Sequence, residues 1–493
     1  MTRSSLLRGH EFVEGIGGRL NRPKADSYKR AVLAIEGRNN EYLARYMLAG
    51  DLACVLSAWE LGVTPDADAK ALIACLLDLL PRADDLGREN AQGDIILQRE
   101  FWVHDAVGSD VGAWLHVGRN RAESLRGSLP RLYFRDVLWH QHVALERLVR
   151  ALVDRAGPTL ESIAPFYHHL QHAGRTSLGE YLLSFATNFH GHFERIEQAD
   201  KRLDLAPPPN TGRKIVVDLI NRMGHRLGFT EVAKLWQELF ITEEHFSEPF
   251  FIFAQISVAL ARLAEDLRLW MTSEFDFFEL ADEHASGSSG RPQKKNPFGL
   301  QAVIGGAAIG AGRIAAQFAL NITVSEEADT TYHAYSMYQF SRDVIEWTHF
   351  MAEVIERGDF KLGELEKKST MGFAGSREAL DILVYDHKIP YRFAHRSLGA
   401  LVREASAGAS ETELTANLTK FLADYPQVDC QEVVRVATGV SKRYILLNVD
   451  AFRQVHTDLG AKLDTIGKTR KENPVDSAID KLMDEGRAAL AKP

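Results

Sequence analysis

Cysteine is scarce in this sequence, which has three among its 493 residues: Cys54, Cys75 and Cys430. They form no C-x-x-C pair and no even-numbered set, which argues against a disulfide framework. Cys54 and Cys75 lie in apolar patterns of helical period, where cysteine behaves as a small core residue. We therefore expect a protein of the reducing cytoplasm.

Positive charge is not in excess either. The formal net charge is -9 and the pI is about 6.1, which argues against a generally basic nucleic-acid-binding surface. The N-terminal residues 1–8 are not followed by an apolar signal core. The smoothest apolar run, 302–311, is closed by Arg313 and is too short to span a bilayer. We expect neither a nucleic-acid partner nor a membrane.

Alternating strand patterns are missing from the sequence. Apolar residues instead recur at three- and four-residue steps almost throughout, which is the period of an amphipathic helix. The pattern predicts long helices over 130–156, 212–227, 247–273, 297–322 and 330–357. Helices of this length with few breakers are typical of a bundle. The fold class is therefore predicted to be all-α, with two to four structural units in a chain of this length.

A glycine-rich stretch at 305–312 superficially suggests a nucleotide-binding loop. No strand precedes it and its spacing is not G-x-G-x-x-G, so small residues at a close helix contact are the better interpretation. We expect no cofactor.

The segment 287–297 has the sequence GSSGRPQKKNP. Its glycines and prolines disfavour both helix and strand, so it is predicted to be a loop. It carries hydroxyls, cations and an amide, with no acidic residue. A serine acts as a base only where cations and N–H donors stabilise its alkoxide. Lys294 and the loop amides supply such groups, and Lys294 with Asn296 can stabilise an anionic intermediate. The loop favours abstraction of a proton beside a carboxylate; the alternative is a solvated basic turn.

Three histidines lie within five residues in the segment 165–173, PFYHHLQHA. His168 and His172 are one helical turn apart and can share a helix face. No carboxylate stands at a matching offset and no cysteine is near, so we expect no metal site. An imidazole that acts as general acid or base is the better functional hypothesis. The alternative is a set of ordinary polar residues at the start of a helix.

A third cluster, 116–123, reads HVGRNRAE. Two arginines beside a glycine can bind a carboxylate in a bidentate manner. Arginines on a helix are usually solvated, so this signal is weak alone.

Together the three clusters resemble one family, the fumarase/aspartase superfamily, and most closely its argininosuccinate lyase branch. The loop 287–297 matches every fixed position of the signature G-S-S-x-x-P-x-K-x-N. The segments 165–173 and 116–123 resemble P-x-Y-T-H-L-Q-x-A and H-T-G-R-S-R-N-D. Further along, 389–395 resembles P-F-R-x-A-H. The resemblance covers roughly residues 40–400 and keeps the order of the motifs.

The resemblance implies a three-domain, mainly helical subunit with a central long-helix bundle. The expected domains are 1–118, 119–372 with the catalytic loop 285–297, and 373–493. It further implies a homotetramer in which three subunits contribute to each active site. A succinyl compound would lose a β-proton and then its leaving group, giving fumarate.

Residue roles follow from the matched positions. Ser288 would be the base, Lys294 and Asn296 would stabilise the aci-carboxylate intermediate, and His169 would protonate or orient the leaving group. The expected substrate-binding residues are Arg121, Asn120, Ser289, Gln171, Tyr332, His168, Arg291 and Gln301.

Several residues depart from the family pattern. His168 replaces a threonine, Ala122 an asparagine, and Gln301 the glutamate that partners the histidine. A glutamine orients an imidazole but cannot stabilise an imidazolium through charge. Each lost polar contact costs about 1–3 kcal/mol, so we do not expect argininosuccinate itself as substrate. Further departures are Gly174-Arg175 for Gln-Pro, Gly290-Arg291 for an apolar pair, and Met337 for a glutamine.

The favoured function is therefore a carbon–nitrogen lyase that acts on an N-substituted aspartate or related succinyl compound, or runs in reverse. One alternative is a nitrosuccinate-type lyase that releases nitrite, since such a leaving group needs little protonation. Another is a catalytically silent lyase scaffold with a structural or binding role, against which the intact set Ser288, Lys294 and Asn296 argues. A cycloisomerase or hydro-lyase on this scaffold is less favoured.

Overall fold

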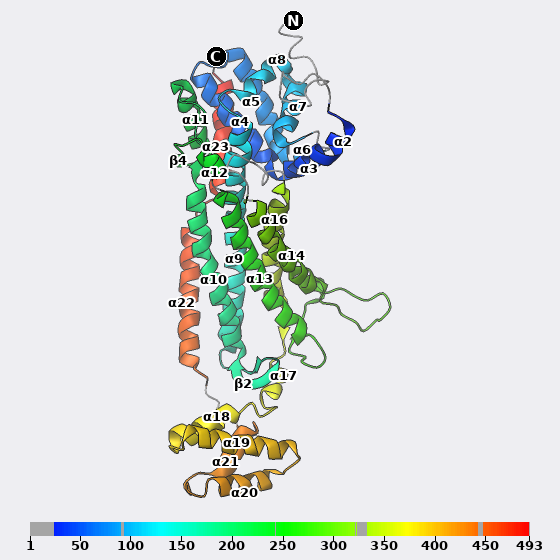
Figure 1. The fold of residues 1–493 in the computed structure, drawn as a ribbon, viewed down its shortest axis with the longest axis vertical. Coiled ribbons are helices and arrows are strands. Elements are labelled where there is room, and N and C mark those ends of the chain that lie inside the picture. Colours follow the sequence, from blue (N-terminus) through cyan, green and yellow to red (C-terminus); the bar gives the residue numbers. More distant parts are fainter. Residues whose placement is uncertain are drawn as a thin grey trace.

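Long helices run side by side along the molecule and form its central body (Figure 1). The structure is a computed structural model that describes residues 24–89, 93–241, 243–320, 322, 333–441 and 447–492. The central body consists of α9 (Leu129–Ala156), α10 (Leu178–Leu203), α13 (Glu244–Trp270), α14 (Phe298–Leu320), α16 (Tyr335–Arg357) and, along its outside, α22 (Val449–Thr469). The predicted helices 130–156, 212–227, 247–273 and 297–322 are confirmed as α9, α11 (Lys214–Arg226), α13 and α14, and the described part of 330–357 is confirmed as α16. The long helices α10 and α22 were not predicted.

The amphipathic pattern of α10 shows why these segments are helical and pack together. Leu182, Ala186, Phe189 and Phe193 recur at three- and four-residue steps and are buried. The Ser177 hydroxyl accepts a hydrogen bond from the Glu180 N–H at 3.0 Å and so caps the helix start. A 26-residue helix with one buried stripe needs neighbours along its full length, which α9 and α13 provide.

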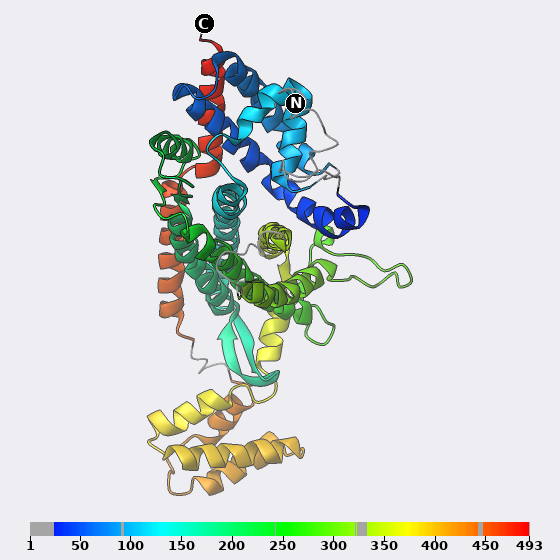
Figure 2. The same ribbon diagram turned by 45° about the horizontal axis from the view of Figure 1, so that its top comes forward.

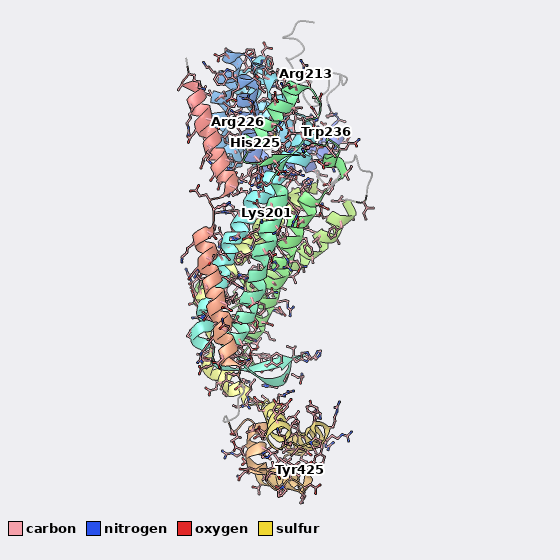
Figure 3. The ribbon with its side chains drawn as sticks, turned by 90° about the vertical axis from the view of Figure 1, so that its left-hand side faces the viewer. Lys201, Arg213, His225, Arg226, Trp236 and Tyr425 are labelled. Carbon is pink, nitrogen blue, oxygen red and sulfur yellow. The ribbon has the colours of Figure 1, made fainter. Side chains whose placement is uncertain are left out.

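Mostly shorter helices form the upper end of the molecule in Figure 1. They are α2 (Asp26–Tyr28), α3 (Ala34–Glu36), α4 (Asn40–Glu60), α5 (Asp66–Leu79), α6 (Ala83–Gly87), α7 (Ile95–Val107) and α8 (Ser109–Gly112). Two helices from later in the chain join them, α11 (Lys214–Arg226) and α23 (Pro474–Leu490). Arg226, labelled in Figure 3, binds Glu60 of α4 at 2.6 Å and Glu485 of α23 at 2.9 Å. This end is therefore assembled from distant parts of the sequence.

A separate lobe at the opposite end has its own apolar cluster within residues 379–437. It contains α18 (Ser376–Asp381), α19 (Tyr391–Ser406), α20 (Glu411–Phe421) and α21 (Cys430–Ala437), and α17 (Leu362–Ser369) leads into it. After the lobe the chain returns along the bundle as α22 and ends as α23 beside α4 and α5. The expected domain boundaries at 118/119 and 372/373 stay a prediction.

The strands of the described residues are short and pair locally. β1 (Ile163–His168) and β2 (Gln171–Ser177) form an antiparallel hairpin, which Figure 2 shows beside α17. The other pairs are β3 (Leu205–Ala206) with β4 (Glu231–Val232), parallel, and β5 (Phe278–Glu279) with β6 (Asp359–Phe360), antiparallel. The all-α fold class is confirmed, because these short two-stranded pairs lie on the helical body and none of them forms the core of the described residues.

The apolar run taken from the sequence to end before Arg313 continues structurally to Leu320. By length and composition, the 23-residue helix α14 is long and apolar enough to cross a membrane, contrary to the expectation from the run alone. Only 22% of its most apolar window is buried within the chain. A single such helix is weak evidence for a span, and its open apolar surface is equally available to another protein chain.

Candidate active site

The three-histidine segment is a β-hairpin, and its prediction as part of a helix is wrong. His169 and Leu170 occupy the two turn positions between β1 and β2 with φ of 52° and 57°. Positive φ at both central residues is the type I′ geometry, whose twist matches that of the flanking strands. His168 pairs with Gln171 across the turn, and His168, His169 and Gln171 are all exposed at the tip. The predicted catalytic histidine thus projects from a tight turn.

His172 differs from the other two histidines because it is partly buried, one residue pair further from the turn, where it pairs with Tyr167. Its Nε2 lies 3.1 Å from the Tyr167 hydroxyl. Burial, and then the nearby Lys368 ammonium, lower the pKa of His172, which favours a neutral imidazole. Because adjacent residue pairs of a hairpin point to opposite faces, His172 does not share a face with His168 as a metal pair would require.

Arg175 anchors the hairpin to the C-terminal lobe. Its Nε donates a hydrogen bond to the Glu378 carboxylate at 2.8 Å, and both side chains are buried. Removing one partner of such a pair would leave an uncompensated buried charge. The departure at Arg175 therefore has a structural reason that the sequence did not show.

The loop 287–297 is closed at its base by a backbone bridge. The Ser286 and Asn296 N–H groups donate to each other's carbonyls at 3.0 and 2.7 Å. The Asn296 side-chain amide donates to the Gly287 carbonyl at 2.9 Å, so in this conformation it also ties the loop. Lys295 binds Asp282 at 2.8 Å and Glu279 at 3.3 Å outside the loop, and these hydrogen-bonded partners raise its pKa. The loop has a fixed base and an open tip.

The tip presents the residues that the sequence singled out. Ser288 is half-buried, and Ser289, Arg291 and Lys294 are exposed. Within the described residues, Lys294 forms no ion pair, in contrast to its neighbour Lys295. Gln301 is exposed on the first turn of α14, directly after the loop. A loop that carries an ammonium without an ion pair and two serine hydroxyls is suited to an anionic ligand.

The 116–123 cluster divides into buried and accessible parts. Arg119 is buried and binds Asp51 at 2.8 Å and Glu123 at 3.0 Å, which makes it structural. Arg121 is partly exposed and is held by the buried Asp94 carboxylate, which also caps α7 through the Leu97 N–H at 3.0 Å.

Asn120 accepts a hydrogen bond from the Glu123 N–H at 2.9 Å, directly before the helical residues 121 and 122 that lead into the π-helical turn Glu123–Ser128. The carboxylates of Asp51 and Asp94 lie far from this cluster in sequence, and only the structure connects them to it.

One chain brings two of the three clusters to the same end of the bundle. Tyr167 of the hairpin lies with its ring centroid 5.5 Å from that of Phe275, just before β5 and the loop. At this end Arg155 of α9 also donates to the Gly358 carbonyl at 2.5 Å, beside β6. Arg121 precedes the opposite end of α9, whose 28 residues span roughly 40 Å at 1.5 Å per residue. Arg121 and Asn120 therefore lie far from the loop and the hairpin of their own chain.

Two further positions complete the comparison with the sequence. Tyr332 lies outside the described residues. Met337, suggested to replace a substrate-binding glutamine, is 2% exposed and belongs to the apolar core.

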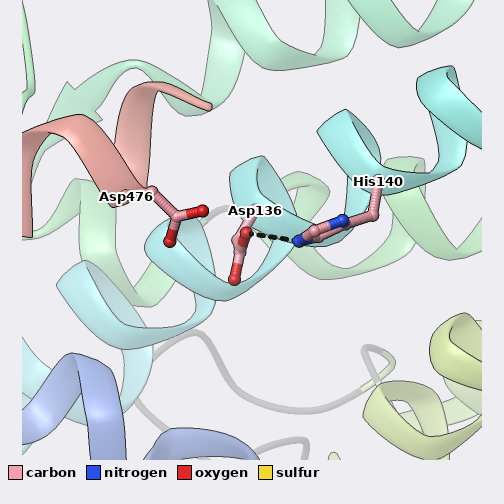
Figure 4. Close-up of side chains that lie close together, drawn as sticks. All are labelled: Asp136, His140 and Asp476. Atoms are coloured by element: carbon pink, nitrogen blue, oxygen red, sulfur yellow. Dashed lines mark ion pairs between the residues drawn. The ribbon is translucent and has the colours of Figure 1, made fainter. Parts of the chain in front are cut away.

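Among the described residues, one group has its potential ligand atoms spaced for a metal: Asp136, His140 and Asp476 (Figure 4). It lies away from the loop and the hairpin. Asp136 accepts hydrogen bonds from Tyr46 and Asn473 at 2.5 Å each, and the Arg45 guanidinium lies 2.6 Å from Asp476. The two carboxylates thus already have cationic and hydrogen-bonding partners. We therefore interpret the group as a structural cluster of polar side chains.

Comparison with known proteins shows the family to which this sequence belongs. Residues 28–311, more than half of the chain, match the sequence profile of a family described as lyase. The chain belongs to this lyase family, within the fumarase/aspartase superfamily.

Relatives of this lyase include the argininosuccinate lyase of Methanocorpusculum labreanum, 27% identical over 83% of this chain and 82% of the relative. The argininosuccinate lyase of Geobacillus kaustophilus is 28% identical over 80% of this chain and 87% of the relative. A variant of EDDS lyase with bound fumarate has the same fold, with a TM-score of 0.75 at 21% identity, covering 95% of this chain and 96% of that one. The superfamily resemblance drawn from the motifs is confirmed.

Proposed function

We propose that this lyase cleaves the carbon–nitrogen bond of an N-substituted aspartate to give fumarate and an amine, or catalyses the reverse addition. The observation that carries the proposal is the loop 287–297, which carries Ser288, Lys294 and Asn296 and is closed at its base. The relatives named argininosuccinate lyase and the shared fold of EDDS lyase support this reaction class.

Each residue has a defined part in the proposed elimination. The Ser288 alkoxide, stabilised by the Lys294 ammonium and loop N–H groups, takes the β-proton of the succinyl group. The resulting aci-carboxylate carries two negative charges, which Lys294 and the Asn296 amide stabilise. The carbon–nitrogen bond then breaks, its electron pair stays on nitrogen, and His169 supplies or orients a proton for the leaving amine. One N–H of the Asn296 side-chain amide is held by the Gly287 carbonyl in this conformation, and the second N–H is the donor proposed to act on the intermediate.

We further propose that the active site is shared between subunits of a cytoplasmic homotetramer. A small substrate cannot bridge the roughly 40 Å of α9 that separates Arg121 from the hairpin in one chain. Other copies can bring Arg121 and Asn120 to the loop. Exposed apolar side chains on α13 and α14 support an interface there: Phe251, Val258, Ile309 and Phe318.

Argininosuccinate is not the proposed substrate. Gln301 directly follows the loop and offers an amide where a carboxylate would stabilise an imidazolium. Ala122, beside Arg121, offers no polar group. The catalytic loop is retained while groups that recognise a polar leaving group are replaced.

Substitution of the base tests the proposal. The variant Ser288→Ala is expected to lose about 10²–10⁴-fold in turnover, the usual contribution of a general base. Fumarate absorbance, followed with N-substituted aspartates, argininosuccinate and nitrosuccinate, measures it. Ser286→Ala is the matched control, because Ser286 closes the loop through its backbone. Both variants should keep the oligomeric state of the parent in light scattering.

Two results would contradict the assignment. Near-normal turnover by Ser288→Ala would remove Ser288 as the base. No fumarate formed or consumed by the unsubstituted protein with any of these compounds would favour the catalytically silent scaffold.

A further inference from the structure

One large aromatic side chain stands open directly after the catalytic loop. Phe298 begins α14, two residues after Asn296, and is 67% exposed. Its direction is set by its neighbours. Leu300 is fully buried, and Gly299 lies so close to the Phe350 ring that an added Cβ would come within 2.3 Å of it.

Phe298 and Gln301 share one face of this first turn. Residues three apart in a helix lie on the same side, and both are exposed. Because the backbone bridge between Ser286 and Asn296 fixes the loop base, this face stays next to the groups proposed to hold the succinyl half. A substituent on the substrate nitrogen that extends toward α14 would meet an aromatic ring and an amide.

Negative charge is missing from the whole segment. No aspartate or glutamate occurs between Glu283 and Glu326, and α14 contains Arg313 as its one charged residue. A guanidinium or a second ammonium on the leaving group would find no carboxylate within this segment, and Glu279 and Asp282 at the loop base already bind Lys295. Desolvating such a cation without a partner is unfavourable, whereas an apolar group gains by leaving water.

We propose that the leaving group is an apolar, aromatic or bulky aliphatic amine, and that Phe298 is the residue that selects it. This inference rests on the proposed carbon–nitrogen lyase function and specifies its substrate class. The substrate is then an aspartate whose nitrogen carries an uncharged apolar substituent. Phe298 contacts that substituent, and Gln301 lies beside it.

Amine addition to fumarate by the intact protein tests the proposal. The probes are 2-phenylethylamine and 1,4-diaminobutane, which attach through the same primary amine but end in a ring or an ammonium. Addition forms the carbon–nitrogen bond and places a proton on the other alkene carbon, so loss of fumarate absorbance reports it. We expect kcat/KM to favour 2-phenylethylamine at least tenfold.

Variants at position 298 separate selection from support of the fold. Phe298→Ala should lower kcat/KM for 2-phenylethylamine about 10- to 100-fold, mainly through KM, because pocket contacts of this size discriminate by that much. Phe298→Leu should recover most of the loss, and Phe298→Asp should shift the preference toward 1,4-diaminobutane. Phe421→Ala is the control, since Phe421 is an exposed phenylalanine at the end of α20 in the C-terminal lobe and should leave the amine preference unchanged.

Each contrary result has a distinct meaning. Equal or better use of 1,4-diaminobutane by the parent protein overturns the inference and leaves the lyase function intact. A smaller oligomer for Phe298→Ala, with both amines affected equally, makes Phe298 a subunit contact and also overturns it. If the parent protein converts neither these amines nor any N-substituted aspartate, the proposed function itself fails.

Discussion

Asn473 joins the C-terminal helix to the buried Asp136 carboxylate, and replacing it should destabilise the protein measurably. It is 4% exposed, and its side-chain amide donates to Asp136 at 2.5 Å. Its side-chain oxygen also accepts the N–H groups of Val475 and Asp476, which caps α23. Loss of the cap costs about 1 kcal/mol. Loss of a hydrogen bond to a charged acceptor costs about 1.5–3 kcal/mol, so Asn473→Ala should lower the free energy of unfolding by about 2.5–4 kcal/mol.

Urea unfolding measures this change, and hydrogen exchange across 474–490 locates it. The matched control is Asn448→Ala, because Asn448 also caps a helix, accepting from the Ala451 N–H at 3.3 Å, but is exposed and has no Asp136 contact. We expect the control to cost about 1 kcal/mol or less. Equal costs for the two variants would refute the reasoning, because the link to Asp136 would then contribute nothing.

Two further predictions concern charge. Lys294→Ala should lower turnover about 10²–10³-fold, as loss of a transition-state donor does, while Lys295→Ala, which removes ion pairs at the loop base, should affect turnover less; comparable losses in a fumarate assay would contradict these separate roles. The hydrogen bond from His140 to Asp136 raises the pKa of His140. Its stabilisation is therefore fully present below pH 6.5, the ordinary value, and is lost as pH rises through the raised folded pKa. His140→Gln should destabilise the protein at pH 6 and progressively less at higher pH, and a urea-unfolding difference that grows with pH would contradict this sign.

The long helices could be predicted because their apolar period extends over many turns. The hairpin at 163–177 could not, since His-Leu is a rare choice for a turn that needs positive φ at both positions, and Asn-Gly or Asp-Gly is the usual signal. The loop 287–297 was recognisable because its unusual composition and residue order do not depend on tertiary context. Asp51, Asp94 and Glu378, which bind Arg119, Arg121 and Arg175, lie far from these arginines in sequence, so no local pattern could reveal these ion pairs. Met337 was placed near substrate by alignment, whereas helical packing buries it.

The position of α23 has a consequence for how the protein is made. Ile479 and Leu482 of α23 are buried in the apolar core that also contains α4 and α5. A ribosome adds about 5–20 residues per second, so the roughly 400 residues between α4 and α23 take about 20–80 s to synthesise. During that time the apolar surface of α4 and α5 that α23 covers in the finished protein remains exposed to solvent or to chaperones.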